Sequence, residues 1–203
     1  MKTFEELKED LLERAKKHNA CQDGYRMGLN AKSKKDLLEA ITSNWFWVFR
    51  TSKMIDANYL EDNFSEEELS EAGIYTRKEH ASNTRAFACG SATVKAYDSA
   101  TVKACDSATV KAYGSATVEA CDSATVKAYG SATVKAYDSA TVEAHESATV
   151  EAYGSATVKA CNNSYVEDCT GNINTVSDYG IVKDYYNHKI YIKKGKFEII
   201  EIE

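Results

Sequence analysis

An eight-residue unit recurs nine times without interruption from Ser91, and it constrains the fold more than any other feature of the chain. The unit reads Ser-Ala-Thr-Val-(Lys/Glu)-Ala-(Tyr/Cys/His)-(Asp/Gly/Glu/Asn). Degenerate copies precede it at 83–90 and follow it at 163–170, and the register continues to Val182. A repeat this strict requires each copy to occupy an equivalent position, so the fold must itself be repetitive.

Each octad predicts one short β-strand and one corner. Ala, Val and Ala occupy positions two, four and six, and such alternation is typical of a strand with one buried face. Position eight holds Asp, Gly, Glu or Asn and is followed by Ser, which indicates a turn. Identical strands joined by short corners favour a β-solenoid whose coils stack about 4.8 Å apart.

The residues at position seven indicate how many octads form one coil. Taking every second octad gives two columns of similar residues, whereas every third octad mixes the types. We therefore predict a flattened solenoid of 16 residues per coil, although duplication of a 16-residue segment would leave the same pattern. The two columns are Cys89, Cys105, Cys121, Tyr137, Tyr153, Cys169 and Tyr97, Tyr113, Tyr129, His145, Cys161.

Position five predicts a different pattern of charge on each of the two sheets. One column alternates in sign, so that stacked neighbours attract one another, and it reads Lys103, Glu119, Lys135, Glu151. The other column begins with three like charges, and it reads Lys95, Lys111, Lys127, Glu143, Lys159.

The first 80 residues lack the repeat and predict several short helices. Thr3 and Glu6 form a capping-box pattern, and apolar residues follow it with helical spacing. Further helices are expected after Ser33 and after Ser65, on either side of the apolar segment 45–49.

The expected architecture is α+β, with three parts in chain order. A small helical domain covers 1–80, and an octapeptide-repeat β-solenoid, with an eight-residue strand unit and two units per coil, covers 83–186. A C-terminal β cap covers 187–203, because 190–192 and 197–199 flank a hairpin-like Lys-Lys-Gly-Lys segment. The first and last parts would cover the ends of the solenoid, whose open strand edges would otherwise pair with other chains.

The composition excludes several classes of protein. No apolar run approaches the ~20 residues of a membrane span, so we expect no membrane contact and a cytoplasmic protein. The net charge of −6 argues against direct binding to nucleic acid. Six cysteines are few for a disulfide scaffold, stacked side chains point the same way, and no secretion signal is present, so reduced thiols are expected.

No residue is predicted to be catalytic, to ligate a metal or to bind a cofactor. The chain contains no P-loop, GxSxG or HExxH motif, and no CxxC pair. His145 stands where other octads hold Tyr or Cys and is interpreted as a tolerated substitution. We therefore expect a protein that is not an enzyme.

Three groups of residues are candidates for contact with a partner. The tyrosine columns offer a strip that contacts protein or stacks on bases, or that simply packs the corners: Tyr97, Tyr113, Tyr129, Tyr137 and Tyr153. The acidic corner residues Asp106, Asp122 and Asp138 are candidates for imitating DNA phosphates. Trp45 and Trp47 would be contact anchors if exposed and core residues if buried.

The segment Ala20-Cys21-Gln22-Asp23-Gly24-Tyr25, with Trp45-Phe46-Trp47 about twenty residues later, resembles a small helical module of short phage and mobile-element proteins. That module carries Ala-Cys-x-x-Gly and a later Trp-x-x-Trp-like pair, whereas the pair here is Trp45-x-Trp47. The octad array resembles octapeptide-repeat solenoids of bacterial and phage origin, which are similar in logic to pentapeptide-repeat proteins. The resemblance implies a mobile-element setting, in which small acidic proteins are often inhibitors of host defence, including anti-CRISPR proteins.

Together these features predict a non-enzymatic interaction protein. The first hypothesis is an anti-CRISPR-like inhibitor that blocks a bacterial nucleic-acid-handling or defence complex by steric occlusion. Its partner would be a protein or ribonucleoprotein complex, in the host bacterial cytoplasm if the chain is phage-encoded. Two alternatives stay open: a structural solenoid that self-associates, for example as a homodimer, and a DNA-mimic inhibitor.

Overall fold

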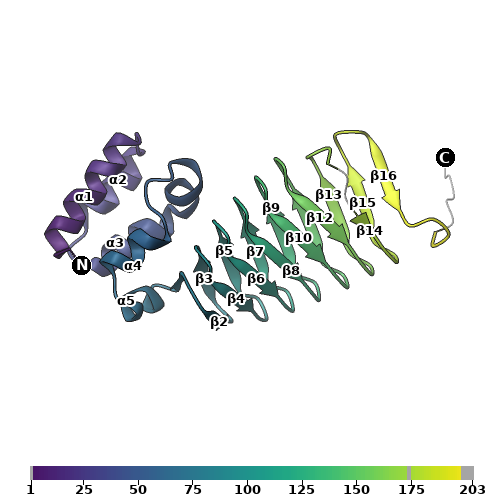
Figure 1. The fold of residues 1–203 in the computed structure, drawn as a ribbon, viewed down its shortest axis with the longest axis horizontal. Helices are drawn as coiled ribbons and strands as arrows, with labels where there is room; N and C mark the ends of the chain where they lie inside the picture. Colours follow the sequence, from purple (N-terminus) through teal and green to yellow (C-terminus); the bar gives the residue numbers. More distant parts are fainter. Residues whose placement is uncertain (1, 173–174, 198–203) are drawn as a thin grey trace.

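A computed structural model describes residues 2–172 and 175–197 of the chain. It contains a helical region followed by a β-solenoid, which confirms the predicted α+β architecture (Figure 1). The helices lie at one end of the long axis, and the coils of the solenoid extend away from them in chain order.

The helical region begins with α1 (Phe4–Lys17) at the predicted capping box. The Glu6 amide donates to the Thr3 hydroxyl, and the Thr3 amide donates to the Glu6 carboxylate. Ser65 and Glu68 repeat this arrangement at the start of the last helix. The remaining helices are α2 (Gln22–Asn30), α3 (Lys34–Ser43), the short π-helix η1 (Trp47–Thr51), α4 (Ala57–Asn63) and α5 (Glu66–Glu71).

Two sheets form the solenoid, and successive strands alternate between them and pair in parallel, except that the last strand pairs antiparallel with the strand before it in the same sheet. Sheet A contains β1 (Ile74–Tyr75), β3 (Arg85–Ala88), β5 (Thr101–Ala104), β7 (Thr117–Ala120), β9 (Thr133–Ala136), β11 (Thr149–Ala152), β13 (Tyr165–Asp168), β15 (Ile181–Asp184) and β16 (Lys189–Ile192). Sheet B contains β2 (Glu79–Ser82), β4 (Thr93–Ala96), β6 (Thr109–Ala112), β8 (Thr125–Ala128), β10 (Thr141–Ala144), β12 (Thr157–Ala160) and β14 (Thr175–Val176).

The register between coils confirms the prediction of two octads per coil. Thr101 pairs with Thr117, and Thr93 pairs with Thr109, so equivalent residues stack at intervals of 16. Each strand of the regular octads buries its Val and its Ala, and these inward side chains form one continuous core with almost no solvent exposure. Because the core contains only small side chains along the repeats, the outward residues alone distinguish one coil from the next.

The corners explain the residue types at position eight. This residue adopts a positive φ at every corner of the regular array, for example +57° at Asp106 and +67° at Gly114. Gly adopts this left-handed conformation without strain, and Asp and Asn tolerate it better than other residues. Glu146 takes the same conformation at +56° without being one of these favoured types.

The solenoid begins earlier than the repeat predicts. Strand β1 already pairs with β3, and β2 pairs with β4, so residues 74–82 belong to the sheets and not to the helical region or a linker. The repeat is unrecognisable there because these coils meet the helices and carry different side chains.

At the C-terminal end, strand β16 pairs antiparallel with β15. The predicted pairing of 190–192 with 197–199 stays a prediction. Residues 198–199 of that second segment lie outside the described residues. Asp168 and Asp184 replace the inward Ala at position six, and each accepts hydrogen bonds from a nearby turn, at Thr170 and Asn187. These buried carboxylates therefore fix the turns with which the regular array ends.

The prediction that all cysteines are reduced is wrong for one pair, because Cys105 and Cys121 form a disulfide between adjacent coils. Their Cα atoms lie 4.9 Å apart, which is within the range that a disulfide can bridge. Side chains in one column start in the same direction, but rotation about the Cα–Cβ bonds is enough to join two sulfurs across one coil spacing.

This pairing makes a direct prediction about thiol content. Under denaturing, non-reducing conditions, four of the six cysteines should react with a thiol reagent, namely Cys21, Cys89, Cys161 and Cys169. Reduction should lower the free energy of unfolding by up to about 3 kcal/mol, because the bond closes a loop of about 16 residues. Reaction of all six cysteines before reduction would contradict the assignment.

Candidate functional site

The two corners of the solenoid that carry position seven have different surroundings. We call them corner A, which follows the strands of sheet A and carries Cys89, Cys105, Cys121, Tyr137 and Tyr153, and corner B, which follows sheet B and carries Tyr97, Tyr113, Tyr129 and His145. The helical region covers the first part of corner A, since its three cysteines are fully buried in the same cluster as the helical core. Corner B carries partly exposed rings, and Tyr97 is 40% exposed.

Three side chains from the segment 46–53 attach the helical region to corner A. Arg50 forms two hydrogen bonds with Asp138, the shorter at 2.7 Å, and its guanidinium lies 4.6 Å from the centre of the Tyr137 ring. Phe46 meets the same ring edge-on at 6.4 Å. Lys53 pairs with Asp122 at 3.0 Å. The helical region therefore reaches along the solenoid as well as covering its first coil.

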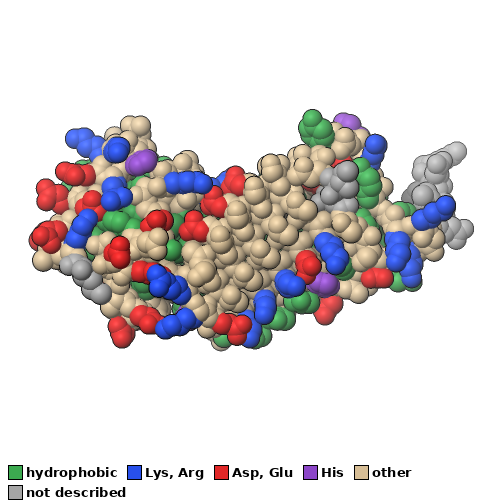
Figure 2. Space-filling model, in the orientation of Figure 1, with side chains coloured by type: hydrophobic (Ala, Val, Ile, Leu, Met, Phe, Trp, Pro, Cys, Tyr) green, Lys and Arg blue, Asp and Glu red, His purple; other side chains and the backbone are tan. Residues whose placement is uncertain are grey.

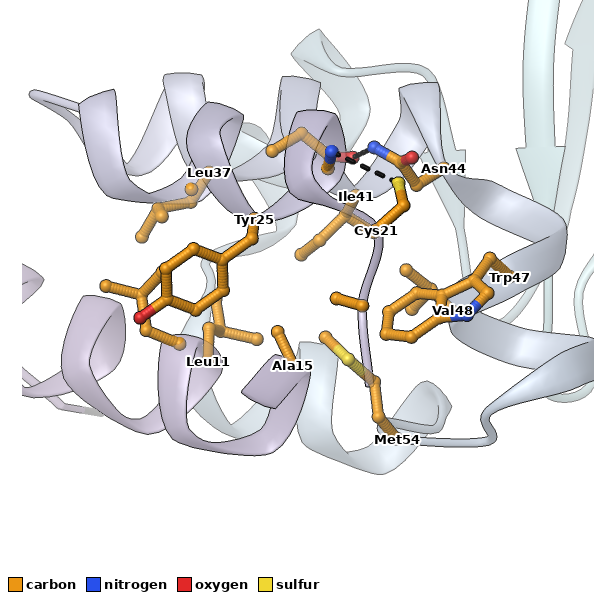
Figure 3. Close-up of a pocket in the computed structure, with 15 residues that line it drawn as sticks. Leu11, Ala15, Cys21, Tyr25, Leu37, Ile41, Asn44, Trp47, Val48 and Met54 are labelled. Atoms are coloured by element: carbon orange, nitrogen blue, oxygen red, sulfur yellow. Dashed lines mark hydrogen bonds between the residues drawn. The ribbon is translucent and has the colours of Figure 1, made fainter. Parts of the chain in front are cut away.

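Trp45 is buried and provides a contact with strand β3 of the solenoid. Its ring lies 4.1 Å from Phe49 and 4.9 Å from Phe87 of β3. Trp47 is half-buried and lines a small apolar cavity of about 50 Å³ among α1, α2 and α3 (Figure 3). This cavity is too small for most ligands, whose pockets measure about 300 Å³ or more. Neither tryptophan is thus placed as an exposed contact anchor.

The acidic corner faces a groove of about 540 Å³ whose other wall carries two cations. The carboxylates of Asp106, Asp122 and Asp138 line it together with Arg50 and Lys53. Figure 2 shows acidic and basic side chains meeting between the helical region and the solenoid. A DNA mimic needs uncompensated negative charge, whereas Arg50 and Lys53 largely neutralise the carboxylates of this acidic corner.

Two carboxylates in this groove, those of Asp138 and Asp106, have opposite pKa shifts. The hydrogen bonds and charge of Arg50 hold the pKa of Asp138 below its usual range. Burial raises the pKa of Asp106, and the nearby charge of Asp122 adds to this effect. The pair between Arg50 and Asp138 thus depends on ionisation of Asp138.

At corner B, tyrosine rings of successive coils stack directly on one another. Ring centres are 5.2 Å apart from Tyr97 to Tyr113 and from Tyr113 to Tyr129, with planes inclined by about 10°. The stack continues to His145 at 5.0 Å. Because neighbouring rings occupy each other's faces, no base can insert between them, and the column presents ring edges and hydroxyl groups.

The tyrosines of corner A are engaged differently. Tyr137 and Tyr153 stack at 5.3 Å, with Tyr137 also held by the helical region. The Tyr153 hydroxyl donates to Glu151 at 2.9 Å, and this bond raises the pKa of Tyr153 to about 12. At corner A the tyrosines thus also contact other parts of the chain, namely the helical region and Glu151.

The outer face of sheet A pairs its charges, as the sequence predicts. Lys103 pairs with Glu119 at 3.3 Å, and Lys135 pairs with Glu151 at 3.1 Å. On sheet B, Lys95 and Lys127 pair outward with Glu79 and Glu143, at 2.5 and 2.9 Å.

Between these pairs on sheet B, Lys111 stacks directly between Lys95 and Lys127. No carboxylate of the described residues forms an ion pair with Lys111. We call the three identical rows around it the TVKAY patch; its outward residues are Thr93, Lys95, Tyr97, Thr109, Lys111, Tyr113, Thr125, Lys127 and Tyr129.

One group among the described residues brings three residues of metal-ligand type together. Cys105, Cys121 and Asp122 place one ligand atom each within 4.8 Å of the others. The two sulfurs are bonded to one another, and zinc binds thiolates. We therefore assign no metal to this group.

Comparison with known proteins finds no matching family model, no matching curated protein and no matching solved structure. Among residues 2–172 and 175–197, no helix is both long and apolar enough to span a bilayer. The candidate site is thus described from its geometry alone.

Sequence reasoning missed the docking of segment 46–53 on corner A. One signal was present: the position-seven column changes from Cys to Tyr between Cys121 and Tyr137, which is where the buried part of the corner ends. Small side chains are needed where the helical region packs on corner A, and aromatic rings fit where the helical region no longer covers the corner.

The charge pattern predicts opposite effects of the same substitution on the two sheets. Lys111→Glu creates alternating charges with Lys95 and Lys127 and should raise the free energy of unfolding by about 0.5 kcal/mol. Lys135→Glu creates a run of four glutamates in one column, with Glu119, Glu151 and Glu167, and should lower the free energy of unfolding by a similar amount, about 0.5 kcal/mol. Thermal melts at low salt and at about 1 M salt check this, since screening should remove both effects. Equal shifts of the same sign would contradict the analysis.

The contact between Arg50 and Asp138 should depend on pH. Because the folded pKa of Asp138 is depressed, its contribution is complete above about pH 3.9 and is lost as the pH falls further. Arg50→Gln should cost about 1 kcal/mol at neutral pH, since both side chains are partly exposed, and the cost should shrink below about pH 4. Denaturant unfolding at both pH values measures the cost.

Arg26→Gln is the matched control, because Arg26 pairs only loosely with Asp23 at 3.9 Å and lies away from the solenoid. A cost at Arg50 that matches the control, or that does not change with pH, would show that the contact does not form in solution.

Proposed function

We propose that the chain is a non-enzymatic interaction protein whose contact surface is the TVKAY patch on the outer face of sheet B. The observation that carries this proposal is the contrast between the two corners. At corner A, ionic and aromatic contacts hold a segment of the chain itself. At corner B, the hydroxyl and ammonium groups of the TVKAY patch form an ordered array that stays partly exposed.

The contacts at corner A indicate what a position-seven corner can bind. A segment with aromatic and charged side chains lies along the column, with rings against rings and charges against the adjacent charged position. Beside the corner B rings the charged side chains are mainly the position-five lysines, because position eight of these three rows holds one Asp and two Gly, so a partner's own charges should be negative.

The target class follows the resemblance to mobile-element proteins. We infer inhibition of a bacterial nucleic-acid-handling or defence complex, with the rigid solenoid occluding the partner's working surface. Ring stacking at corner B disfavours direct base contact, which supports a protein surface of such a complex as the target. Ion pairing at Asp122 and Asp138 disfavours the DNA-mimic alternative.

Affinity capture from bacterial lysate, with and without nuclease and followed by mass spectrometry, tests this proposal. The tagged protein should retain one stoichiometric partner that survives nuclease treatment. A variant that combines Lys111→Glu with Tyr113→Ala should lose that partner, whereas Lys135→Gln on sheet A should keep it. Retention of the partner by the sheet B variant, or recovery of no partner, would overturn the proposal.

A further inference from the structure

The disulfide of corner A has a free cysteine on the next coil. Strands β3, β5 and β7 pair in register, so Cys89, Cys105 and Cys121, which follow them, stack on three successive coils. The Cys105 amide donates to the preceding coil at 3.0 Å, and the Cys121 amide does so at 2.9 Å. The two steps of the column therefore have the same backbone geometry, and Cys105 has a cysteine within bridging distance on each side.

Cys89 carries a free thiol that the helical region covers. The thiol is fully buried, as are the two bonded sulfurs, and all three belong to the cluster formed with the helical core. Burial raises the pKa of the Cys89 thiol. Three nearby carboxylates raise the pKa further, namely those of Asp106, Glu61 and Asp56. Because the thiolate is the form that attacks a disulfide, the docked helical region keeps Cys89 unreactive.

The contacts that hold this cover in place are partly exposed. The segment 46–53 docks through the ion pairs of Arg50 with Asp138 and of Lys53 with Asp122, and solvent reaches at least one side chain of each pair. Exposed ion pairs contribute little to stability, and local opening costs less free energy than global unfolding. Release of the helical region would remove the burial that suppresses the Cys89 thiolate.

We propose that Cys89, Cys105 and Cys121 form a thiol–disulfide exchange site controlled by docking of the helical region. While the region is docked, the bond joins Cys105 to Cys121, as the structure shows. When the region is released, Cys89 displaces Cys121 and takes over the bond to Cys105. The position of the bond thus depends on whether the helical region covers the column.

The exchange needs no oxidant and no reductant. Cys89 loses its proton to water, and its thiolate attacks the Cys105 sulfur from the side opposite to Cys121, which is the in-line direction. The bond between Cys105 and Cys121 breaks as the new bond forms, and Cys121 leaves as a thiolate that takes up a proton. The Asp122 carboxylate, 3.5 Å from the Cys121 sulfur, accepts a hydrogen bond from the new thiol.

The exchange changes the place of the free thiol and not the number of thiols. Before the exchange the free thiol lies on the first coil, in the cluster with the helical core. Afterwards it belongs to Cys121, whose neighbour Asp122 lines the groove between the helical region and corner A. In the released column Cys105 has two equivalent partners, so both bonds should be populated.

Slow labelling with N-ethylmaleimide at about pH 8 tests the exchange in the full-length protein. The reagent is kept dilute, so that exchange within the chain is faster than labelling. After quenching with acid, mass spectrometry maps the labelled and the bonded cysteines. Label should appear at Cys89 and at Cys121 in comparable amounts, on different molecules, and molecules labelled at Cys121 should carry the bond between Cys89 and Cys105. A column without exchange would give label at Cys89 alone.

A docking variant shows whether the helical region controls the exchange. Arg50→Gln with Lys53→Gln removes both ion pairs of the segment 46–53 and should raise the labelling rate of Cys121 about tenfold. Arg26→Gln with Lys35→Gln is the matched control, because it removes the same charge from exposed positions of the helical region. The control should label at the wild-type rate.

A Cys121→Ser variant tests the geometry of the column without an opening step. Prepared under the conditions that oxidise the wild-type protein, it should join Cys89 to Cys105 and leave three of its five cysteines free in denaturant. Five free thiols would show that Cys89 does not reach Cys105 and would overturn the proposal. Label confined to Cys89 in the wild-type protein, or equal Cys121 labelling in the docking variant and its control, would overturn it as well.

Discussion

In-register hydrogen bonding between successive coils determines the rest of this structure. Each backbone strand bonds to its equivalent one coil away, so residues 16 apart stack directly above one another. Whatever the sequence repeats becomes a column: alanines and valines become a core, and charges and rings become ladders. A single substitution in the repeat therefore acts on both neighbours in its column, above and below.

This rule gives the two sides of the solenoid different roles. On sheet A, alternating charges satisfy one another, and corner A binds the segment around Arg50, so this side contributes to stability. On sheet B, three identical rows stack like charges around Lys111, which reduces stability slightly. Sheet B therefore has the less favourable charge arrangement in the free protein, and an anionic partner would relieve its repulsion.

Periodic features could be predicted from the sequence because they are local. Alternation in each octad indicated the strands, the pairing of Cys with Cys and Tyr with Tyr at position seven indicated 16 residues per coil, and the Thr3 capping box indicated the start of α1.

Contacts between distant segments left little pattern in the sequence. Arg50 lies 88 residues from Asp138, and nothing near either residue indicates the pairing. The Cys105–Cys121 bond could not be predicted for a different reason: residues in one column share a common side-chain direction, and it is rotation about the Cα–Cβ bonds that brings the two sulfurs together. The candidate surface was only partly predicted: the tyrosine column was identified, but the covering of corner A, which singles out corner B, required the structure.

Covalent lysine footprinting of the protein with and without its bound partner tests most directly whether sheet B is the contact surface. Labelling at Lys95, Lys111 and Lys127 should fall on binding, while Lys103 and Lys135, on the outer face of sheet A, should react equally in both states. Protection of the sheet A lysines, with no change at Lys111, would contradict the assignment of the contact surface to sheet B.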